Sequence, residues 1–321
     1  MQRREALKIA AGGVAALAIK RSAAGLDAQT PIIDAHIHLF DPTRTGGVPW
    51  PEKDDKALYK PALPGRYEAL SKPFGVVGAI AIEASPLASD NQWLLAIAQK
   101  NPVIVGVIGD LVPSSPDFRK QLDAVHKNSL FLGIRYGNLW NRDLMVDLEK
   151  PGFVDGLKAL AQSGLVFESA NPDPRLIRSV LNVAERVPDL RIVIDHLPHA
   201  AVPTDGAEHD EYWADLRKLG QSAHIFVKLS EIPVVKDGLL VTDTKFYREP
   251  LDALWDVFGE DRVIFGSDWP NSDHVASYAE TFGIVRNYMA EKSPQMREKY
   301  YWKNSIAAYH WRRRRADQPS G

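Results

Sequence analysis

Residues 32–38 read Ile-Ile-Asp-Ala-His-Ile-His, and this short apolar run with two histidines at its end decides the fold. Side chains alternate between the two faces of a β-strand, so His36 and His38 lie on one face and Ile37 on the other. Two imidazoles at the end of a buried strand cost free energy unless they find partners. The pattern therefore favours a chemical role over a pair of core histidines.

A matching feature lies near the other end of the chain, where residues 263–270 read Val-Ile-Phe-Gly-Ser-Asp-Trp-Pro. This run is again an apolar strand, and it leads to the carboxylate of Asp268. Six further short runs rich in Val, Ile and Phe lie between the two, at 76–83, 103–109, 131–135, 165–168, 191–195 and 225–229. Amphipathic stretches of helical length separate most of them.

Short apolar runs with little alternation, separated by helices, are typical of parallel strands buried on both faces. Eight such units in a length close to the ~250 residues of the class predict a single-domain α/β fold, a (β/α)₈ TIM-type barrel over residues 29–321. A doubly wound open sheet is the alternative, although the chain lacks a glycine-rich nucleotide loop. We expect helix starts at Asp90 and at Ser115-Pro116, and closing helices over 274–292 and 294–310.

The sixth run ends in Ile192-Val-Ile-Asp-His196. Because the carboxyl ends of barrel strands meet at one mouth, His196 is expected to join the histidines of the first strand there. Asp195 is expected to point away as a supporting carboxylate, and His199 to face solvent. The predicted catalytic group consists of His36, His38, His196 and Asp268.

The first connection, residues 41–75, is long and rich in proline. A loop in this position lies over the mouth of a barrel, where such enzymes build their sites. We expect it to form a lid or wall for a substrate, with Trp50 and Tyr59 as substrate-binding residues. The alternative is that it only packs over the mouth.

Composition excludes several classes of protein. The balance of 39 basic to 41 acidic residues gives no electrostatic case for binding nucleic acid. The chain has no cysteine, which excludes disulfides and thiolate metal sites. No apolar stretch is long enough to span a bilayer. The oligomeric state cannot be read from the sequence.

The first 28 residues differ in character from the rest. Arg3-Arg4 is followed by a small, apolar run from Ile9 to Ile19 and then by a second basic pair. This arrangement resembles a twin-arginine export signal, although Ala6 replaces the common Phe. Residues 1–28 are therefore predicted to be a signal, and the protein to be periplasmic or exported. The alternative is an amphipathic arm on a cytoplasmic protein.

Five motifs together carry a resemblance to a known family. They are Asp34-Ala-His-Ile-His38, Gly133-Ile-Arg135, Asp195-His196, Lys228-Leu-Ser230 and Gly266-Ser-Asp-Trp-Pro270. In this combination the chain resembles the amidohydrolase superfamily of the amidohydrolase 2 type. Within it, the chain is similar to the lactonase branch that includes 2-pyrone-4,6-dicarboxylate lactonase and sugar lactonases. The resemblance covers nearly all of the chain after residue 30.

The resemblance implies a hydrolase that opens a carboxylated or sugar-acid lactone. Asp268 would accept a proton from the attacking water, and the three histidines would polarise the lactone carbonyl. The matching arginine of related lactonases binds the substrate's carboxylate, and a guanidinium is a rigid bidentate partner for such a group, so Arg135 is the predicted anchor of an anionic small molecule. The structural alternative pairs Arg135 with a neighbouring acid.

Three histidines and an aspartate also suit a divalent ion such as Zn²⁺. In the superfamily, tight metal binding generally adds a histidine at strand five, where this chain has Glu168, and binuclear sites add a lysine or carboxylate at strand four. We therefore expect no obligatory metal. The alternative is one Zn²⁺ or similar ion on His36, His38 and Asp268, with Glu168 as an extra ligand.

Two other functions stay open on the same barrel. One is a zinc-dependent amidohydrolase or a non-oxidative decarboxylase, because decarboxylating relatives share the paired histidines and the aspartate of strand eight. The other is a binding protein without activity, which has no need of a carboxylate base beside three imidazoles.

Overall fold

The fold is an eight-stranded parallel barrel. The computed structural model describes residues 30–321, so the predicted signal at 1–28 lies outside the described residues. The strands follow one another around the sheet in chain order. They are β1 (Ile32–His38), β2 (Val76–Ile82), β3 (Ile104–Gly109), β4 (Phe131–Arg135), β5 (Val166–Ser169), β6 (Arg191–Ile194), β7 (Ile225–Leu229) and β10 (Val263–Phe265).

The first and last strands close the barrel. Ile37 and Trp269 form a parallel bridge. The amide of His38 donates to the carbonyl of Trp269 at 2.7 Å, and the amide of Asp268 donates to the carbonyl of His36 at 2.9 Å. This closure confirms the predicted (β/α)₈ barrel and excludes the open sheet. The same backbone bonds hold the motif at 32–38 beside the motif at 263–270.

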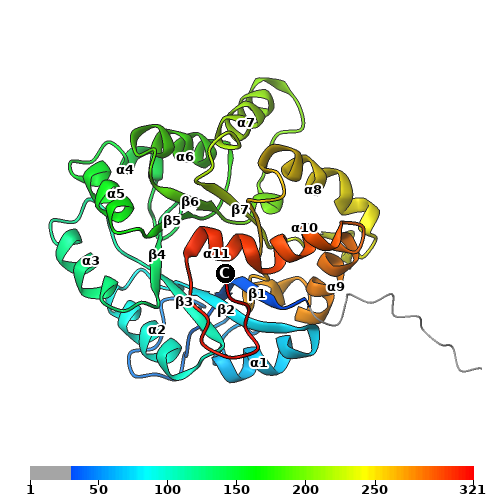
Figure 1. Cartoon of the computed structure of the whole chain (residues 1–321), viewed down its shortest axis with the longest axis horizontal. Coiled ribbons are helices and arrows are strands. Elements are labelled where there is room, and N and C mark those ends of the chain that lie inside the picture. The colour runs from blue at the N-terminus through cyan, green and yellow to red at the C-terminus, as the bar shows by residue number, and fades with distance from the viewer. Residues whose placement is uncertain (1–29) are drawn as a thin grey trace, which may run out of the picture.

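Helices surround the strands, as Figure 1 shows. The main ones are α1 (Pro64–Ser71), α2 (Ala88–Lys100), α3 (Phe118–His126), α5 (Phe153–Gln162), α6 (Pro174–Arg186), α7 (Gly206–Leu219), α8 (Thr244–Phe258) and α9 (Tyr278–Met289). The short α4 (Leu144–Asp147) follows β4, and a hairpin of β8 (Val235–Lys236) and β9 (Leu239–Leu240) follows β7. No helix within residues 30–321 has both the length and the apolarity that a membrane span requires.

Local details differ from the sequence prediction. Helix α2 begins at Ala88, so Asp90 lies in its first turn, where it pairs with Arg44 at 2.6 Å instead of capping. Helix α3 begins at Phe118, because Ser115-Pro116 forms a turn before it. After β10, α9 is shorter than expected. The second closing helix consists of α10 (Pro294–Glu298), a π-helical turn (Lys299–Lys303) and α11 (Asn304–Tyr309).

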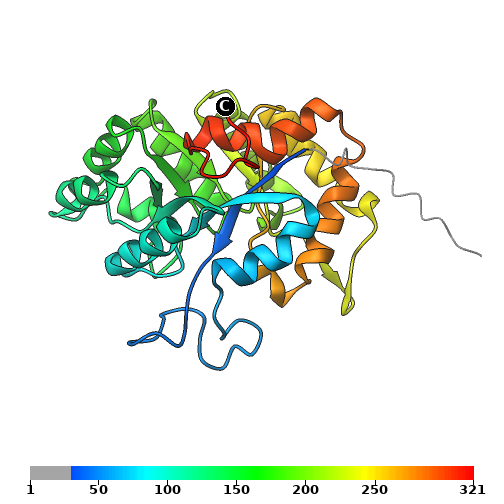
Figure 2. The ribbon, with the colours of Figure 1, turned by 60° about the horizontal axis from the view of Figure 1, so that its bottom comes forward.

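The two ends of the barrel are covered differently. In Figure 2 the long loop after β1 extends from one side of the barrel, and α11 with the C-terminal segment crosses the opposite side. Tyr309 and Trp311 from that segment pack into a buried cluster with strand residues such as Ile33 and Ile80. The end away from the loop is thus plugged by side chains, which leaves the end at the carboxyl termini of the strands for a site.

A bulge in β1 presents both histidines to the mouth. The pairing of β1 with β2 shifts register between Asp34 and Ile37. Ile37 packs in the larger core cluster, whereas His36 and His38 lie close to Asp268 from β10. The seam is tight, because a Cβ added to Gly266 would lie 2.7 Å from the Cβ of His36.

Candidate active site

A cavity of about 370 Å³ opens at the carboxyl ends of the strands. Its lining includes three of the four predicted catalytic residues, namely His38, His196 and Asp268. Arg135 and Trp50 line it as well. The sequence motifs from distant parts of the chain thus converge on a single cavity.

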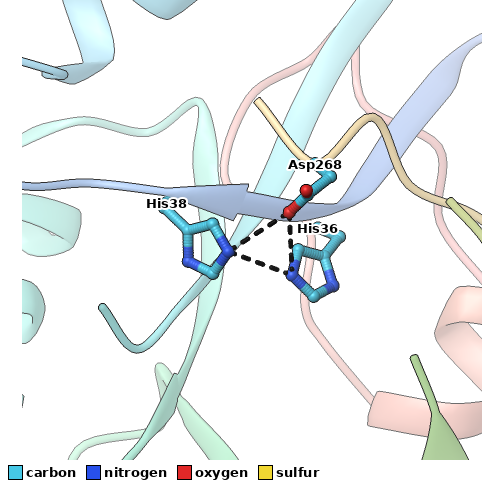
Figure 3. A group of neighbouring side chains, drawn as sticks. All are labelled: His36, His38 and Asp268. Carbon is cyan, nitrogen blue, oxygen red and sulfur yellow. Dashed lines mark hydrogen bonds and ion pairs between the residues drawn. The ribbon is translucent and has the colours of Figure 1, made fainter. Parts of the chain in front are cut away.

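Asp268 contacts all three histidines of the group, and Figure 3 shows its carboxylate beside His36 and His38. Its Oδ1 lies 3.4 Å from Nε2 of His36 and 3.2 Å from Nε2 of His38. Nε2 of His196 is 3.9 Å from the same oxygen. The structure therefore brings all four predicted catalytic residues together, although His36 is fully buried and is not part of the cavity lining.

Hydrogen bonds fix the orientation of two of the rings. Nδ1 of His38 lies 3.2 Å from the carbonyl of Ile82, which only accepts, so this nitrogen carries the proton. Nε2 of His38 is then directed at Asp268 Oδ1. Nδ1 of His196 contacts the hydroxyl of Ser230 at 2.9 Å, which leaves its Nε2 on the side of Asp268.

The two oxygens of Asp268 have different surroundings. Oδ2 accepts a hydrogen bond from Asn271 Nδ2 at 2.8 Å. Oδ1 is buried and has no hydrogen-bond partner. A buried carboxylate oxygen without a donor is costly, which marks Oδ1 as the atom that meets a water molecule, a substrate or a cation.

Charge states in this group follow from burial and from neighbouring charges. Burial alone would raise the pKa of Asp268, but the adjacent His196, His38 and His36 hold that pKa below its ordinary value. Burial lowers the pKa of His196 to about 4. Burial, assisted by the ammonium group of Lys228, also places the pKa of His36 well below its usual range. At neutral pH an ionised carboxylate therefore faces neutral imidazoles of His36 and His196.

The same atoms fit a divalent ion. His36, His38 and Asp268 each offer one ligand atom, and these atoms all lie within 4.8 Å of one another. A tetrahedral zinc ion with bonds of about 2.0–2.1 Å places its ligand atoms roughly 3.3 Å apart, and the separations here are 3.2–3.4 Å. Within residues 30–321, Glu168 belongs to none of the clusters in which three His, Asp or Glu ligand atoms lie within 4.8 Å of one another.

Glu168 instead belongs to a charged layer beneath the cavity. The fully buried Lys228 lies with its Nζ 2.9 Å from Glu168 Oε1, 3.1 Å from Asp195 Oδ1 and 3.2 Å from His36 Nδ1. The expectation that Asp195 points away from the site is wrong. Its neighbour His196 adopts the left-handed conformation, with φ of 53°, which breaks the alternation on which that expectation depends.

Arg135 is held by a neighbouring acid, as the structural alternative anticipated. Its Nε donates to Glu83 Oε1 at 2.8 Å and its Nη2 to the Glu83 carbonyl at 2.9 Å. Its Nη1 lies 3.8 Å from Asp195. The guanidinium borders the cavity, but its charge is already shared with two carboxylates.

The long loop after β1 contributes one wall. The ring of Trp50 stands 5.7 Å from that of His38 and 5.1 Å from that of Phe40. Tyr59, the other predicted substrate-binding residue, is half-buried in the same loop and does not line the cavity. His199 lines the mouth with its ring largely exposed, as expected.

Sequence reasoning missed several residues of the lining, above all Glu231, Trp140 and Asn171. Glu231 follows β7 by two residues, and its Oε2 lies 3.7 Å from Nδ1 of His196. Burial raises its pKa to about 8, with a smaller contribution from Asp268. Its position just after the Lys228-Leu-Ser230 motif is the signal that could have identified it.

Comparisons with known proteins show which chains this protein is similar to. The chain is 30% identical over 305 residues to an L-fucono-1,5-lactonase from Burkholderia ambifaria, an alignment that covers 90% of this chain and 97% of the relative. A zinc-bound crystal structure of an amidohydrolase from Burkholderia multivorans superposes with a TM-score of 0.76 at 22% identity, covering 88% of this chain and 100% of that one.

A third similarity is to the crystal structure of a probable 2-pyrone-4,6-dicarboxylic acid hydrolase from Acinetobacter baumannii with bound citric acid. Its TM-score is 0.69 at 17% identity, over 87% of this chain and 99% of that chain. The amidohydrolase family model matches residues 33–311. This match spans nearly the whole barrel, including Asp268 and the three histidines around its Oδ1, and the chain therefore belongs to the amidohydrolase family.

Proposed function

We propose that this protein hydrolyses the ring ester of a neutral sugar-acid lactone. The observation that carries the proposal is Asp268 Oδ1, a buried carboxylate oxygen without a donor that lies beside the imidazoles of His38 and His196. The similarity to an L-fucono-1,5-lactonase along nearly the whole chain supports the same reaction.

Asp268 is the base in this proposal. Its low pKa keeps it ionised at neutral pH, and its Oδ1 accepts a proton from a water molecule in the cavity. The oxygen of that water forms a bond to the lactone carbonyl carbon, and the ring C–O bond then breaks. The product is an open hydroxy acid.

His196 lines the cavity and is placed to donate from Nε2 to the carbonyl oxygen as its negative charge develops, whereas the proton of His38 lies on Nδ1 and its Nε2 faces Asp268. One such donor contributes roughly 3–4 kcal/mol to the stability of the transition state. His36 is covered by this layer and contacts Asp268 from below. In the absence of an ion, it therefore acts by holding the base rather than by touching the substrate.

A divalent ion is compatible with the same residues. His36, His38 and Asp268 would hold it, and a bound Zn²⁺ would supply Lewis-acid polarisation and lower the pKa of a bound water. The zinc in the related fold from Burkholderia multivorans supports this alternative to a metal-free site.

The charge of the cavity favours an uncharged substrate over the anionic one expected from sequence. Within the described part of the chain, Arg135 is the one Arg or Lys side chain of the lining, and Glu83 and Asp195 already balance it. A substrate carboxylate would have to displace Glu83 or stay unpaired near Asp268. Hydroxyl groups of a sugar-acid lactone meet neither penalty.

A substrate panel tests the proposal. We expect the purified protein to open aldono-1,5-lactones such as L-fucono-1,5-lactone with kcat/KM at least about ten-fold above that for 2-pyrone-4,6-dicarboxylate. The Glu83→Gln variant, which releases the charge of Arg135, should shift the ratio towards the dicarboxylate. A preference of the wild type for the dicarboxylate would contradict the substrate class, and failure to open any lactone would contradict the function.

A further inference from the structure

Glu231 is placed like a member of the catalytic group. Strand β7 ends at Leu229, and the next residue, Ser230, contacts Nδ1 of His196 through its hydroxyl. Glu231 follows and lines the cavity, with a quarter of its side chain exposed. Its carboxyl group thus enters the cavity beside His196.

The backbone of Glu231 has the same left-handed conformation as that of the predicted catalytic residues His196 and Asp268. Eight non-glycine residues in the described part of the chain have positive φ, and five of them line the cavity: Trp140, Asn171, His196, Glu231 and Asp268. Asn171, His196 and Glu231 each stand two residues after the end of their strand. Left-handed conformations of residues with side chains are strained and cluster at functional sites. Glu231 thus occupies the same position after the end of β7 that His196 occupies after the end of β6.

The carboxyl groups of Glu231 and Asp268 are close enough to act on one reacting centre. Ligand atoms of His196, Glu231 and Asp268 all lie within 4.8 Å of one another. In the tetrahedral intermediate of lactone hydrolysis, the attacking oxygen and the ring oxygen are bonded to the same carbon. A group that accepts a proton from one and a group that donates to the other must therefore be neighbours.

We propose that Glu231 is the general acid of the ring opening and protonates the ring oxygen as its bond to the carbonyl carbon breaks. This inference rests on the proposed lactonase function. Asp268 takes one proton from water, the new C–O bond forms, and the ring oxygen leaves as a hydroxyl group with the proton of Glu231. The proton on Asp268 then returns to Glu231, and the new carboxylic acid releases its proton to solvent.

The environment of Glu231 keeps a proton available. Burial and the ionised Asp268 raise the pKa of its carboxyl group to about 8, so the neutral form predominates at neutral pH. An alkoxide leaving group gains most from such a donor, because an alcohol is a far weaker acid than the carboxyl group that protonates it.

A purely structural role for Glu231 is the competing explanation. Its Oε2 lies 3.7 Å from Nδ1 of His196, beyond hydrogen-bonding distance, whereas the Ser230 hydroxyl occupies that nitrogen at 2.9 Å. Ser230 therefore orients His196 already, which leaves the carboxyl group of Glu231 available to a substrate.

The experiment compares two lactones that differ in their leaving group. L-fucono-1,5-lactone releases an alcohol, and dihydrocoumarin releases a phenol, whose pKa of about 10 lets it leave without a donated proton. For Glu231→Gln we expect kcat to fall about 10²–10⁴-fold on the sugar lactone and less than about ten-fold on dihydrocoumarin. Thermal unfolding of each variant checks the fold, and Glu231→Asp tests whether a carboxyl group in this place restores part of the rate.

Each result has a defined meaning. Equal losses on both substrates in a folded Glu231→Gln protein would show that Glu231 acts only through His196, and no loss on either would show no role. Both results overturn the proposal. Glu185→Gln, at an exposed position on α6, is the matched control and should leave both rates unchanged. A wild type that opens neither lactone would instead overturn the proposed function itself.

Discussion

At the residue scale, His36 and His38 lie two residues apart on one strand but differ in how deeply they are buried. His36 is fully buried against Asp268 and Lys228, whereas His38 lines the cavity. Both meet Asp268 Oδ1 through Nε2. Without an ion, a substitution at His38 changes the cavity lining beside the base, and one at His36 disturbs the position of the base from below.

The pH dependence follows from the same side chains. The pKa of Asp268 lies below its ordinary value and that of His196 is about 4, so no loss of kcat/KM is expected on lowering the pH from about 7 to about 5. The pKa of Glu231, which faces His196, His199, Asp268 and Arg135, is about 8. Because the donor must hold its proton, kcat/KM should fall as the pH rises above about 8.

Stopped-flow or pH-stat rates from about pH 5 to 10 measure this profile. In Glu231→Gln the alkaline decline should vanish, since an amide does not titrate. A decline of unchanged shape in that variant would assign it to another group.

At the element scale, side chains from three neighbouring strands or their ends contact one another around a buried ammonium group. Lys228 of β7 pairs with Glu168 of β5 and lies 3.1 Å from Asp195, which follows β6. All three side chains are fully buried. Breaking such a network leaves carboxylates without a counter-charge, which is far costlier than losing a surface ion pair.

We therefore expect Lys228→Met to reduce the free energy of unfolding by about 3–5 kcal/mol, measured by denaturant titration. Lys158→Met is the control, because its pair with Asp155 on α5 is largely exposed and should contribute less than about 1 kcal/mol. Equal effects of the two substitutions would mean that the buried network does not stabilise the barrel.

The seam between β1 and β10 is a second element-scale feature. Gly266→Ala places a methyl group 2.7 Å from the Cβ of His36, so it should destabilise the protein by about 1–3 kcal/mol and lower turnover by displacing that histidine. Gly283→Ala on α9 is the matched control, since nothing lies within 4 Å of its added methyl group. There we expect a stabilisation of about 0.4–1 kcal/mol. A Gly266→Ala variant with the melting temperature of the wild type would show that the seam relaxes to accept the methyl group.

At the scale of the whole molecule, periodicity predicted the barrel and the strand-end histidines and aspartate. Eight apolar runs mark eight strands because each is buried on both faces. Alternation alone failed at Asp195. Because His196 has a left-handed backbone, the side chains of Asp195 and His196 both point toward the site instead of to opposite faces. Alternation also gave no means to find Glu231 or the pairing of Arg135 with Glu83, since both depend on loop conformation and on contacts between distant strands.

The most direct test of the proposed mechanism is the turnover of L-fucono-1,5-lactone by the wild type and by Asp268→Asn, measured side by side at neutral pH. Asparagine keeps the size of the side chain and removes its ability to take a proton. If Asp268 is the base, we expect a folded variant whose kcat is lower by about 10²–10⁴-fold. A folded Asp268→Asn protein with nearly the wild-type rate would contradict the assignment of Asp268 as the base.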